Sequence, residues 1–218
     1  MKPEINRLIY SELASPHLKS GSRVLEIGCC DAKNFYYLRE LKPVSYFGVD
    51  LDDANLKLAS ANNVRVIKAD LEKGYFPFKS RFDLIIITEV LEHLKSPGNL
   101  LDKIRPFLNA GGLVLVSLPN EYNLFSRLRA LFGMGIDDNA LKSMDKHLHF
   151  PTVTQSIGFM KEHFWVIGIK YWSSSGGRLS FFLRFIPDSF FTFLAGLMPG
   201  LFSRGVIILC KAEDKQSK

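Results

Sequence analysis

The first half of the chain alternates between two hydrophobic patterns. Short runs of consecutive apolar residues have the length of strands and lie at residues 23–27, 45–49, 64–68, 82–87 and 113–118. Before and between them, apolar residues recur every three to four positions, as in an amphipathic helix. These helical segments lie at residues 4–18, 35–41, 54–61 and 97–108. Such alternation predicts an α/β fold, a parallel sheet with helices on both faces.

Some of the strand-like runs are continuously apolar and show no alternation of polar residues. The run Leu84-Ile85-Ile86-Ile87 is the clearest example. A strand that is covered on both faces loses the polar alternation of a strand with one exposed face. We therefore expect the central strands to be buried on both sides.

Beyond residue 120 the alternation is looser. The pattern predicts helices at residues 122–132 and 151–163, a loop at 133–145, and strands at 165–172 and 206–211. A length of 218 residues fits one domain. Residues 1–218 are therefore treated as a single domain with a core at 20–120, a second segment at 121–163 and an insertion at 173–205.

The insertion is rich in phenylalanine and longer than most connections between strands. It contains seven of the 18 Phe residues, at positions 181, 182, 185, 190, 191, 193 and 202. Clustered rings with arginines at their edges predict a hydrophobic lid over an acceptor pocket or a contact with a membrane surface. A dimer interface or simple core packing would use the same residues. The uncharged run 189–203 is shorter than the ~20 residues of a membrane-spanning helix.

Charge and cysteine content narrow the classes of function. A net charge of +6 over 218 residues is dilute, so no stable nucleic-acid partner is expected. Three cysteines, two of them adjacent, form neither a disulfide framework nor a zinc-binding spacing. The first residues lead into a charged amphipathic stretch, which is not typical of a secretory signal. These features predict a cytoplasmic protein, with attachment to a membrane as an alternative.

Small and polar residues follow the ends of the predicted strands. They are Gly28, Asp50, Asp70, Thr88-Glu89 and Pro119-Asn120. Ligands of open α/β sheets bind outside the carboxyl ends of the strands. We therefore expect these residues to line one crevice.

Three of these positions suit a nucleoside. The turn after Gly28 has small residues at positions 30 and 32, which let a ligand approach the backbone closely. Asp50 ends the next strand, where a carboxylate accepts hydrogen bonds from ribose hydroxyls. The turn at Asp70 suits an adenine amino group. Either aspartate would serve equally well as a helix or turn cap, and the sequence leaves both interpretations open.

Six elements carry a resemblance to a known family. They are Val24-Leu25-Glu26-Ile27-Gly28-Cys29, Gly48-Val49-Asp50, Ala69-Asp70-Leu71, Phe82-Asp83-Leu84-Ile85, Glu89-Val90-Leu91-Glu92-His93-Leu94 and Leu108-Asn109-Ala110-Gly111-Gly112. In order and spacing they resemble the motifs of class I S-adenosyl-L-methionine (SAM)-dependent methyltransferases of the small-molecule type. The resemblance implies a Rossmann-like sheet of seven strands, with helices on both faces and the last strand antiparallel. It departs at Cys30 and Ala32, where the family usually has glycine.

The resemblance also implies a cofactor site for SAM. Glu26 and Gly28 would hold the methionine end, Asp50 the ribose, and Asp70 with Leu71 the adenine. The full set of candidate cofactor-binding residues is Glu26, Gly28, Cys29, Cys30, Asp50, Leu51, Asp70, Leu71, Thr88 and Glu89. A Rossmann dehydrogenase fits less well, because the missing glycines are those that a pyrophosphate requires.

Histidines and carboxylates supply the candidate catalytic groups. His93, His147 and His149 are candidate bases, since a nucleophile that carries a proton must lose it. Glu89, Glu92 and His93 are similar to a segment of metal-dependent O-methyltransferases, and such a group suits a divalent ion that lowers a hydroxyl pKa. The same segment also resembles many metal-free methyltransferases, and a later histidine would alternatively pack under its loop.

Together these features predict a SAM-dependent methyltransferase with a small, hydrophobic acceptor. A lipid-like molecule is one candidate for this acceptor. Oxygen is the favoured methylated atom. One alternative is a nucleic-acid methyltransferase, which only the positive charge favours. Another is a non-catalytic SAM-fold protein whose altered glycine loop has lost the cofactor. The expected use of residues 179–202 is a peripheral membrane contact or a homodimer.

Overall fold

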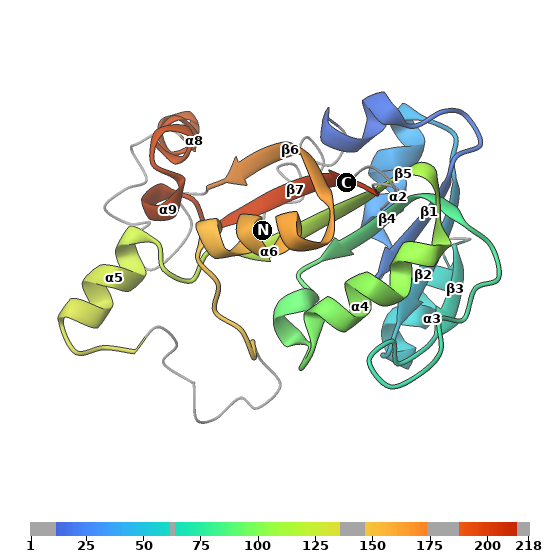
Figure 1. Ribbon diagram of the computed structural model, residues 1–218, viewed down its shortest axis with the longest axis horizontal. Helices are drawn as coiled ribbons and strands as arrows, with labels where there is room; N and C mark the ends of the chain where they lie inside the picture. Colours follow the sequence, from blue (N-terminus) through green and yellow to red (C-terminus); the bar gives the residue numbers. More distant parts are fainter. Residues whose placement is uncertain (1–11, 62–63, 136–146, 174–187, 213–218) are drawn as a thin grey trace.

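The computed structural model describes residues 12–61, 64–135, 147–173 and 188–212. Within them, seven strands form one sheet in the order β3-β2-β1-β4-β5-β7-β6 (Figure 1). The strands are β1 (Arg23–Ile27), β2 (Ser45–Asp50), β3 (Arg65–Lys68), β4 (Phe82–Thr88), β5 (Leu108–Pro119), β6 (Trp165–Trp172) and β7 (Gly205–Lys211). Strand β7 is antiparallel to both of its neighbours, and β1 to β5 are mutually parallel. The predicted sheet with an antiparallel last strand is confirmed.

Helices cover both faces of this sheet, as predicted. They are η1 (Ser15–His17), α2 (Lys33–Leu41), α3 (Asp53–Ala61), η2 (Leu91–His93), α4 (Pro97–Ile104), η3 (Arg105–Phe107), α5 (Leu124–Leu131), α6 (Val153–His163), α8 (Asp188–Leu197) and α9 (Pro199–Phe202). Leu38 of α2 and Ala59 of α3 belong to one buried cluster. Leu101 of α4 and Met160 of α6 belong to the other. The molecule therefore has two cores, one on each face of the sheet.

Strand β4 lies between these two cores and contributes to both. Leu84 and Ile86 pack in the cluster with α2, whereas Ile85 and Ile87 pack in the cluster with α4. All four side chains are fully buried. Successive side chains of a strand point to opposite faces, so an uninterrupted apolar run serves two cores at once.

Helix α4 is shorter than its sequence pattern predicts. The pattern extends to residue 108, but the α-helix ends at Ile104 and a 3-10 turn follows. Pro106 explains the early end, because proline has no N–H to donate to the carbonyl oxygen four residues earlier. The first predicted helix, at residues 4–18, lies partly outside the described residues, and its described part is helical only at 12–17.

Strand β5 is longer than predicted. It includes Gly111 and Gly112, where a turn was expected. It begins at Leu108, and its pairing with β4 shifts register beside Gly111 and Gly112. Gly111 has a φ of +72°, and a Cβ on Gly112 would lie 2.8 Å from the carbonyl oxygen of Asn109. The two glycines therefore permit an irregularity within the strand, where a turn before it was predicted.

The carboxyl half starts at a well-defined cap. The Thr152 side chain accepts a hydrogen bond from the Gln155 amide, and Gln155 in turn accepts from the Thr152 amide, which forms a capping box. Of the predicted insertion, α8 and α9 lie in the described residues, whereas Phe181, Phe182 and Phe185 fall outside them. Figure 1 places α5, α8 and α9 together at one end of the molecule. None of the helices in the described ranges has the length and apolar character of a membrane span.

Candidate cofactor and catalytic site

The loop after β1 is fixed to the end of β2. The amides of Gly28 and Cys29 both donate to the carbonyl oxygen of Val49, at 2.8 and 3.0 Å. The amide of Cys30 donates to Oδ2 of Asp50 at 2.8 Å. Two strand ends that the sequence predicts to share a crevice are therefore in direct contact.

This loop adopts the left-handed conformation at three alternate positions. The φ angles are +69° at Gly28, +45° at Cys30 and +58° at Ala32. Left-handed backbone costs a residue with a side chain about 1–2 kcal/mol, which glycine avoids. The two departures from the glycine pattern therefore keep the backbone shape that glycine would favour. The loop thus keeps its left-handed backbone at Cys30 and Ala32 although neither residue is glycine.

The residues around the loop must be small. A Cβ on Gly28 would lie 2.4 Å from Cγ2 of Val90, and a Cβ on Gly48 would lie 2.6 Å from Sγ of Cys29. The Cys29 side chain therefore occupies the space above Gly48. Burial raises the pKa of the Cys29 thiol, and it raises the pKa of Cys30 to about 11. A raised pKa lowers the thiolate fraction, and the buried Cys29 has a packing role, whereas Cys30 is exposed.

Glu26 is a buried carboxylate beneath this loop. Asn34 Nδ2 donates to its Oε1 at 2.5 Å, and the Tyr46 hydroxyl donates to its Oε2. Burial is the main cause that raises its pKa to about 7, and the negative charges of Asp31 and Asp50 add to it. Both hydrogen-bond donors are neutral. A cationic ligand such as the ammonium group of SAM would stabilise the ionised carboxylate, so Glu26 fits the predicted methionine end.

Asp50 keeps acceptor capacity for a ligand. Its Oδ2 accepts from the Cys30 amide and its Oδ1 accepts from the Asp52 amide at 2.9 Å. A carboxylate has about four lone-pair sites, so each oxygen retains one. The neighbouring Leu51 side chain is 59% exposed, an apolar group at the same strand end. The geometry accommodates both the capping role and the predicted ribose contact.

Asp70 is engaged by its own turn. Its Oδ1 accepts from the amides of Glu72 and Lys73, and Lys73 Nζ lies 3.3 Å from its Oδ2. These contacts lower the pKa of Asp70. The adjacent Leu71 is buried, and Lys103 Nζ donates to its carbonyl oxygen. Asp70 therefore caps the turn that follows it. The adenine contact of Asp70 and Leu71 stays a prediction.

The end of β4 brings a second buried carboxylate. Glu89 follows Thr88, the last residue of the strand, and has a φ of +53°. Ser117 Oγ donates to Glu89 Oε1 at 2.7 Å. Burial raises the pKa of Glu89. Its side chain therefore points to strand β5, and this contact joins two parallel strand ends.

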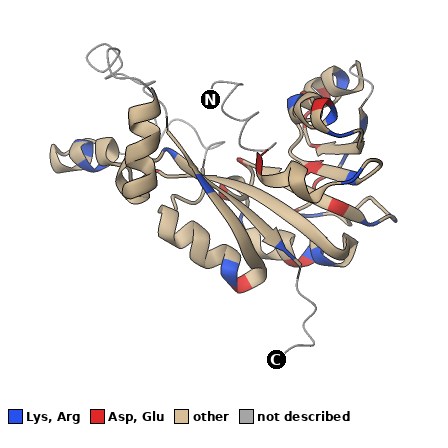
Figure 2. Ribbon diagram, turned by 90° about the horizontal axis from the view of Figure 1, so that it is seen from above, with Lys and Arg blue, Asp and Glu red and all other residues tan. Residues whose placement is uncertain are grey.

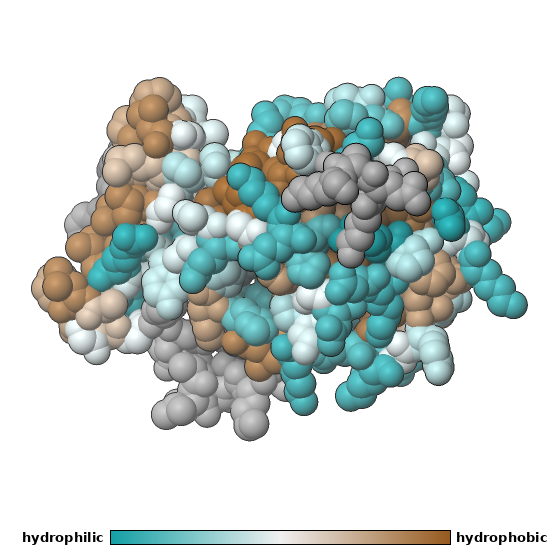
Figure 3. Space-filling model, in the orientation of Figure 1, coloured by the Kyte–Doolittle hydropathy of each residue, from teal (hydrophilic) through white to brown (hydrophobic). Residues whose placement is uncertain are grey.

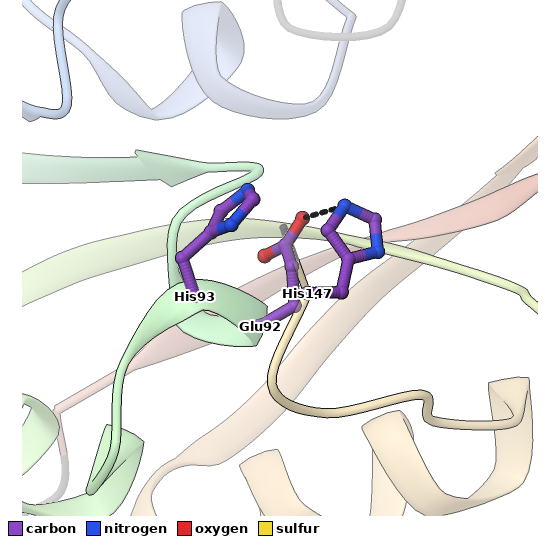
Figure 4. A group of neighbouring side chains, drawn as sticks. All are labelled: Glu92, His93 and His147. Carbon is purple, nitrogen blue, oxygen red and sulfur yellow. Dashed lines mark ion pairs between the residues drawn. The ribbon is translucent and has the colours of Figure 1, made fainter. Parts of the chain in front are cut away.

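A group of three side chains lies beyond this strand end. Glu92 and His93 come from η2, and His147 comes from the segment before α6 (Figure 4). Glu92 Oε1 lies 3.9 Å from Nε2 of His147, and the two imidazole rings are 4.8 Å apart. The amides of Leu148 and His149 both donate to the Glu92 carbonyl oxygen, which holds the later segment against η2.

Glu92 lacks a hydrogen bond to either of its carboxylate oxygens within the described residues, and it is fully buried. Burial raises its pKa to about 8, with the charges of Glu89 and Glu121 as further causes. Glu121 Oε1 lies 2.8 Å from Nδ1 of His147. His147 is thus placed between two carboxylates, one partly exposed and one buried.

These three side chains could hold a divalent ion. Glu92, His93 and His147 each offer a ligand atom, and the three atoms lie within 4.8 Å of one another. Two imidazoles and one carboxylate suit several divalent transition metals, and an unsatisfied buried carboxylate favours a cation. Glu89 belongs to the ligand set predicted from sequence, but the described contact of its side chain is with Ser117.

His149 lies apart from this group. Its Nε2–H donates to the carbonyl oxygen of Leu94 at 2.9 Å, so the ring fastens its segment to the end of η2. Asn120, at the end of β5, is also structural in its described contacts: its Nδ2 donates to the Ser203 carbonyl oxygen at 2.9 Å. Glu121 is not among the site residues predicted from the sequence, although it directly follows the predicted strand-end residue Asn120.

Comparison with known proteins identifies the family. Residues 2–168 match the family model described as a methyltransferase domain. The ubiquinone biosynthesis O-methyltransferase of Roseobacter denitrificans is 30% identical over 135 residues, 56% of this chain and 50% of that protein. The (S)-coclaurine N-methyltransferase of Papaver somniferum is 30% identical over 116 residues, 50% of this chain and 32% of that protein. A phthiotriol/phenolphthiotriol dimycocerosates methyltransferase of Mycobacterium ulcerans is 27% identical over 155 residues, 65% of this chain and 57% of that protein.

Solved structures share the fold at low sequence identity. A coclaurine N-methyltransferase bound to N-methylheliamine and S-adenosylhomocysteine superimposes with a TM-score of 0.64 at 15% identity, covering 96% of this chain and 72% of that one. The N-methyltransferase NodS of Bradyrhizobium japonicum, bound to S-adenosylhomocysteine, gives 0.61 at 14% identity, covering 97% and 86%.

The chain therefore belongs to the methyltransferase domain family. It has the fold of class I methyltransferases, and two solved structures with this fold hold S-adenosylhomocysteine. The matched segments of the three curated relatives are 32–57% of those proteins. The family and the fold inferred from the six sequence elements are confirmed.

Proposed function

We propose that the protein transfers the methyl group of SAM to a hydroxyl oxygen of a small, hydrophobic acceptor. The observation that carries this proposal is the position of His147 between Glu121 and Glu92, beside the end of β4. A hydroxyl nucleophile carries a proton that must leave during the transfer. An oriented imidazole beside the strand ends is suited to take it.

The proposed reaction is a displacement at the sulfonium methyl carbon. The carbon–sulfur bond breaks, a carbon–oxygen bond forms, and S-adenosylhomocysteine leaves as a neutral thioether. Glu121 accepts a hydrogen bond from Nδ1–H of His147, so Nε2 is left to accept the proton of the acceptor hydroxyl. Most of the rate gain in such a reaction comes from alignment of oxygen, carbon and sulfur.

The hydrophobic character of the acceptor is inferred from the elements next to His147. Helix α5 begins three positions after Glu121, and its side chains Leu124, Phe125 and Leu128 are exposed. Such residues would contact an apolar acceptor more favourably than a charged one. The names of two relatives refer to ubiquinone biosynthesis and to dimycocerosates, and they agree with this acceptor class.

A divalent ion at Glu92, His93 and His147 is a second form of the proposal. The ligand atoms within 4.8 Å and the unsatisfied oxygens of Glu92 favour it. Such an ion would lower the pKa of a bound acceptor hydroxyl. In that form His147 would be a ligand of the ion together with Glu92 and His93, and it would not serve as the base. A cytoplasmic location is part of both forms, and free thiols at Cys29, Cys30 and Cys210 support it.

The test is transfer of a radiolabelled methyl group from SAM to a panel of acceptors. The panel contains hydrophobic phenols and catechols, matched amines, and total tRNA, each with and without a chelator. Label in the phenols or catechols is expected. Label in the amines alone would overturn O-methylation, and label in tRNA alone would support the nucleic-acid alternative. Activity that a chelator abolishes and added metal restores would favour the metal form over His147 as the base.

A further inference from the structure

Helices α5 and α8 bury almost none of their side chains. The only buried residue of α5 is Ser126, and among the described side chains of α8 it is Ala195. A surface helix of a globular protein normally turns an apolar stripe to the core and a polar stripe to water. In α5 and α8 the fully buried positions hold small residues. Large apolar residues such as Leu131 and Phe193 face outward, and Phe191 and Leu194 are half-buried.

The outward residues form one surface at the end of the molecule. It consists of Leu128, Leu131 and Phe132 at α5 and Phe193, Leu197 and Met198 at α8, and we call it the apolar end surface. Their side chains are 46–78% exposed. Helix α9 packs against both α5 and α8 and so connects the two groups. Figure 3 shows the hydrophobic colouring over this end, in contrast to the hydrophilic surface of the opposite end.

Positive charges predominate near this surface, although α8 begins at Asp188. Residues 122–135 and 189–204 contain no Asp or Glu, but they include Arg127, Arg129 and Arg204. Figure 2 shows Lys and Arg colouring on α5 and no acidic colouring there. Apolar side chains beside arginines match the surface of a bilayer that contains anionic lipids. A two-fold dimer through the same surface would bring the arginines of two copies together, which is unfavourable.

The apolar end surface is joined firmly to the sheet. The Asn120 amide donates to the Arg204 carbonyl oxygen at 2.8 Å, and the Asn120 side chain holds the end of α9 through Ser203. Ser173 Oγ donates to the carbonyl oxygen of Phe202 at 2.9 Å. An element that is fixed in this way presents its apolar residues without having to unfold, and the ordering cost of binding is small.

We propose that the protein binds the surface of an anionic bilayer through the apolar end surface. Leucine, phenylalanine and methionine side chains enter the headgroup region, and the arginines contact lipid phosphates. Binding therefore needs both the apolar side chains and the negative lipid charge. The proposal does not depend on which acceptor atom is methylated.

The test is vesicle flotation of the full chain with two compositions, phosphatidylcholine alone and phosphatidylcholine mixed with phosphatidylglycerol. We expect binding to the mixed vesicles that weakens with salt, and at least about tenfold weaker partitioning of Leu131→Glu/Phe193→Glu. The matched control is Leu41→Glu/Leu58→Glu, which adds the same two charges at leucines of α2 and α3 that are 47% and 56% exposed. Calorimetric binding of SAM by each variant shows that it is folded.

A second measurement reports insertion directly. Phe193→Trp should be quenched by brominated lipids in the mixed vesicles beyond the parent chain, and Leu58→Trp should not. No binding of the parent chain, equal binding to neutral vesicles, or equal binding by Leu131→Glu/Phe193→Glu with intact SAM affinity would each overturn the proposal. A stable dimer in solution that the same double variant dissociates would also overturn it.

Discussion

The two ends of the molecule use apolar residues in opposite ways. In the cofactor half, strands β1 and β4 bury almost every apolar side chain, and polar side chains such as Asp50 contact the neighbouring backbone. In the half that holds α5 and α8, side chains as large as Leu131 and Phe193 face outward at 78% and 62% exposure. The strands of the first half thus use their apolar side chains in the core, whereas the helices of the second half leave large apolar side chains exposed.

This difference suggests a division of roles, with cofactor binding in the first half and acceptor binding in the second. The candidate cofactor-binding residues all lie in the first half, in the loop after β1 and at the ends of the neighbouring strands. The family match ends at residue 168, before α8 and β7. Changes in the cofactor half should therefore alter SAM binding, and changes near His147 should alter turnover alone.

The largest expected effect tests that separation at His147. His147→Gln should lower methyl transfer by about 10²–10⁴-fold with little change in SAM affinity, because the base acts on the acceptor. Methyl-transfer assays and SAM calorimetry measure the two quantities. His163→Gln is the matched control, since His163 pairs with Asp102 away from the site. A parallel fall in SAM affinity would contradict the division between the two halves.

Gly28→Ala should have the next largest effect, and it should act on the cofactor half. Its Cβ would meet Val90 at 2.4 Å on left-handed backbone, so we expect a loss of about 2–4 kcal/mol in unfolding free energy and strongly weakened SAM binding. Urea unfolding and calorimetry measure these changes. Gly158→Ala is the control: a Cβ there meets nothing within 4 Å in α6, so the helix should gain about 0.5–1 kcal/mol. Equal stability of the two variants would contradict the close approach of Val90.

The strand ends explain how much of this site could be predicted. The spacing from Gly28 to Asp50 predicts their proximity, because parallel strands end at one edge of a sheet and both follow such ends. The partners of Glu26 were not predicted. Tyr46 and Asn34 reach it from the next strand and the next helix, so their contacts depend on packing between elements.

The acceptor side was harder to predict for a related reason. The pairing of His147 with Glu121 joins segments 26 positions apart, and no periodic pattern relates them. The exposed apolar residues of α5 have helical spacing, which predicts a helix but does not reveal which side faces water. The buried strands of the cofactor half leave no such choice, since both of their faces are covered.

Glu26→Gln should change how the free energy of unfolding depends on pH. The raised pKa of about 7 means that the folded state binds a proton more tightly than the unfolded state, so this group lowers stability as pH rises from about 4.5 to 7. At pH 8 the Gln variant should therefore unfold with up to about 3 kcal/mol more free energy, and this gain should vanish near pH 4.

SAM binding should show the opposite preference, since an ionised Glu26 attracts the ammonium group. SAM affinity of the parent chain should be about tenfold weaker at pH 6 than at pH 8, and the Gln variant should lose this dependence. Calorimetry at several pH values measures the affinity, and Glu162→Gln, an exposed carboxylate of α6, is the control. A pH-independent SAM affinity of the parent chain would remove Glu26 from the methionine end.

Cys30→Gly should have the smallest effect, and it tests whether the loop carries strain. At a φ of +45°, glycine relieves the contact between Cβ and the backbone but gains freedom in the unfolded chain. The net stabilisation should be about 0.5–1 kcal/mol, with SAM affinity nearly unchanged. Cys30→Ala is the matched control, because it removes the thiol and keeps the Cβ. Urea unfolding in which the two variants are equally stable would mean that the loop tolerates a side chain here without strain, and that its lost glycines had no energetic consequence.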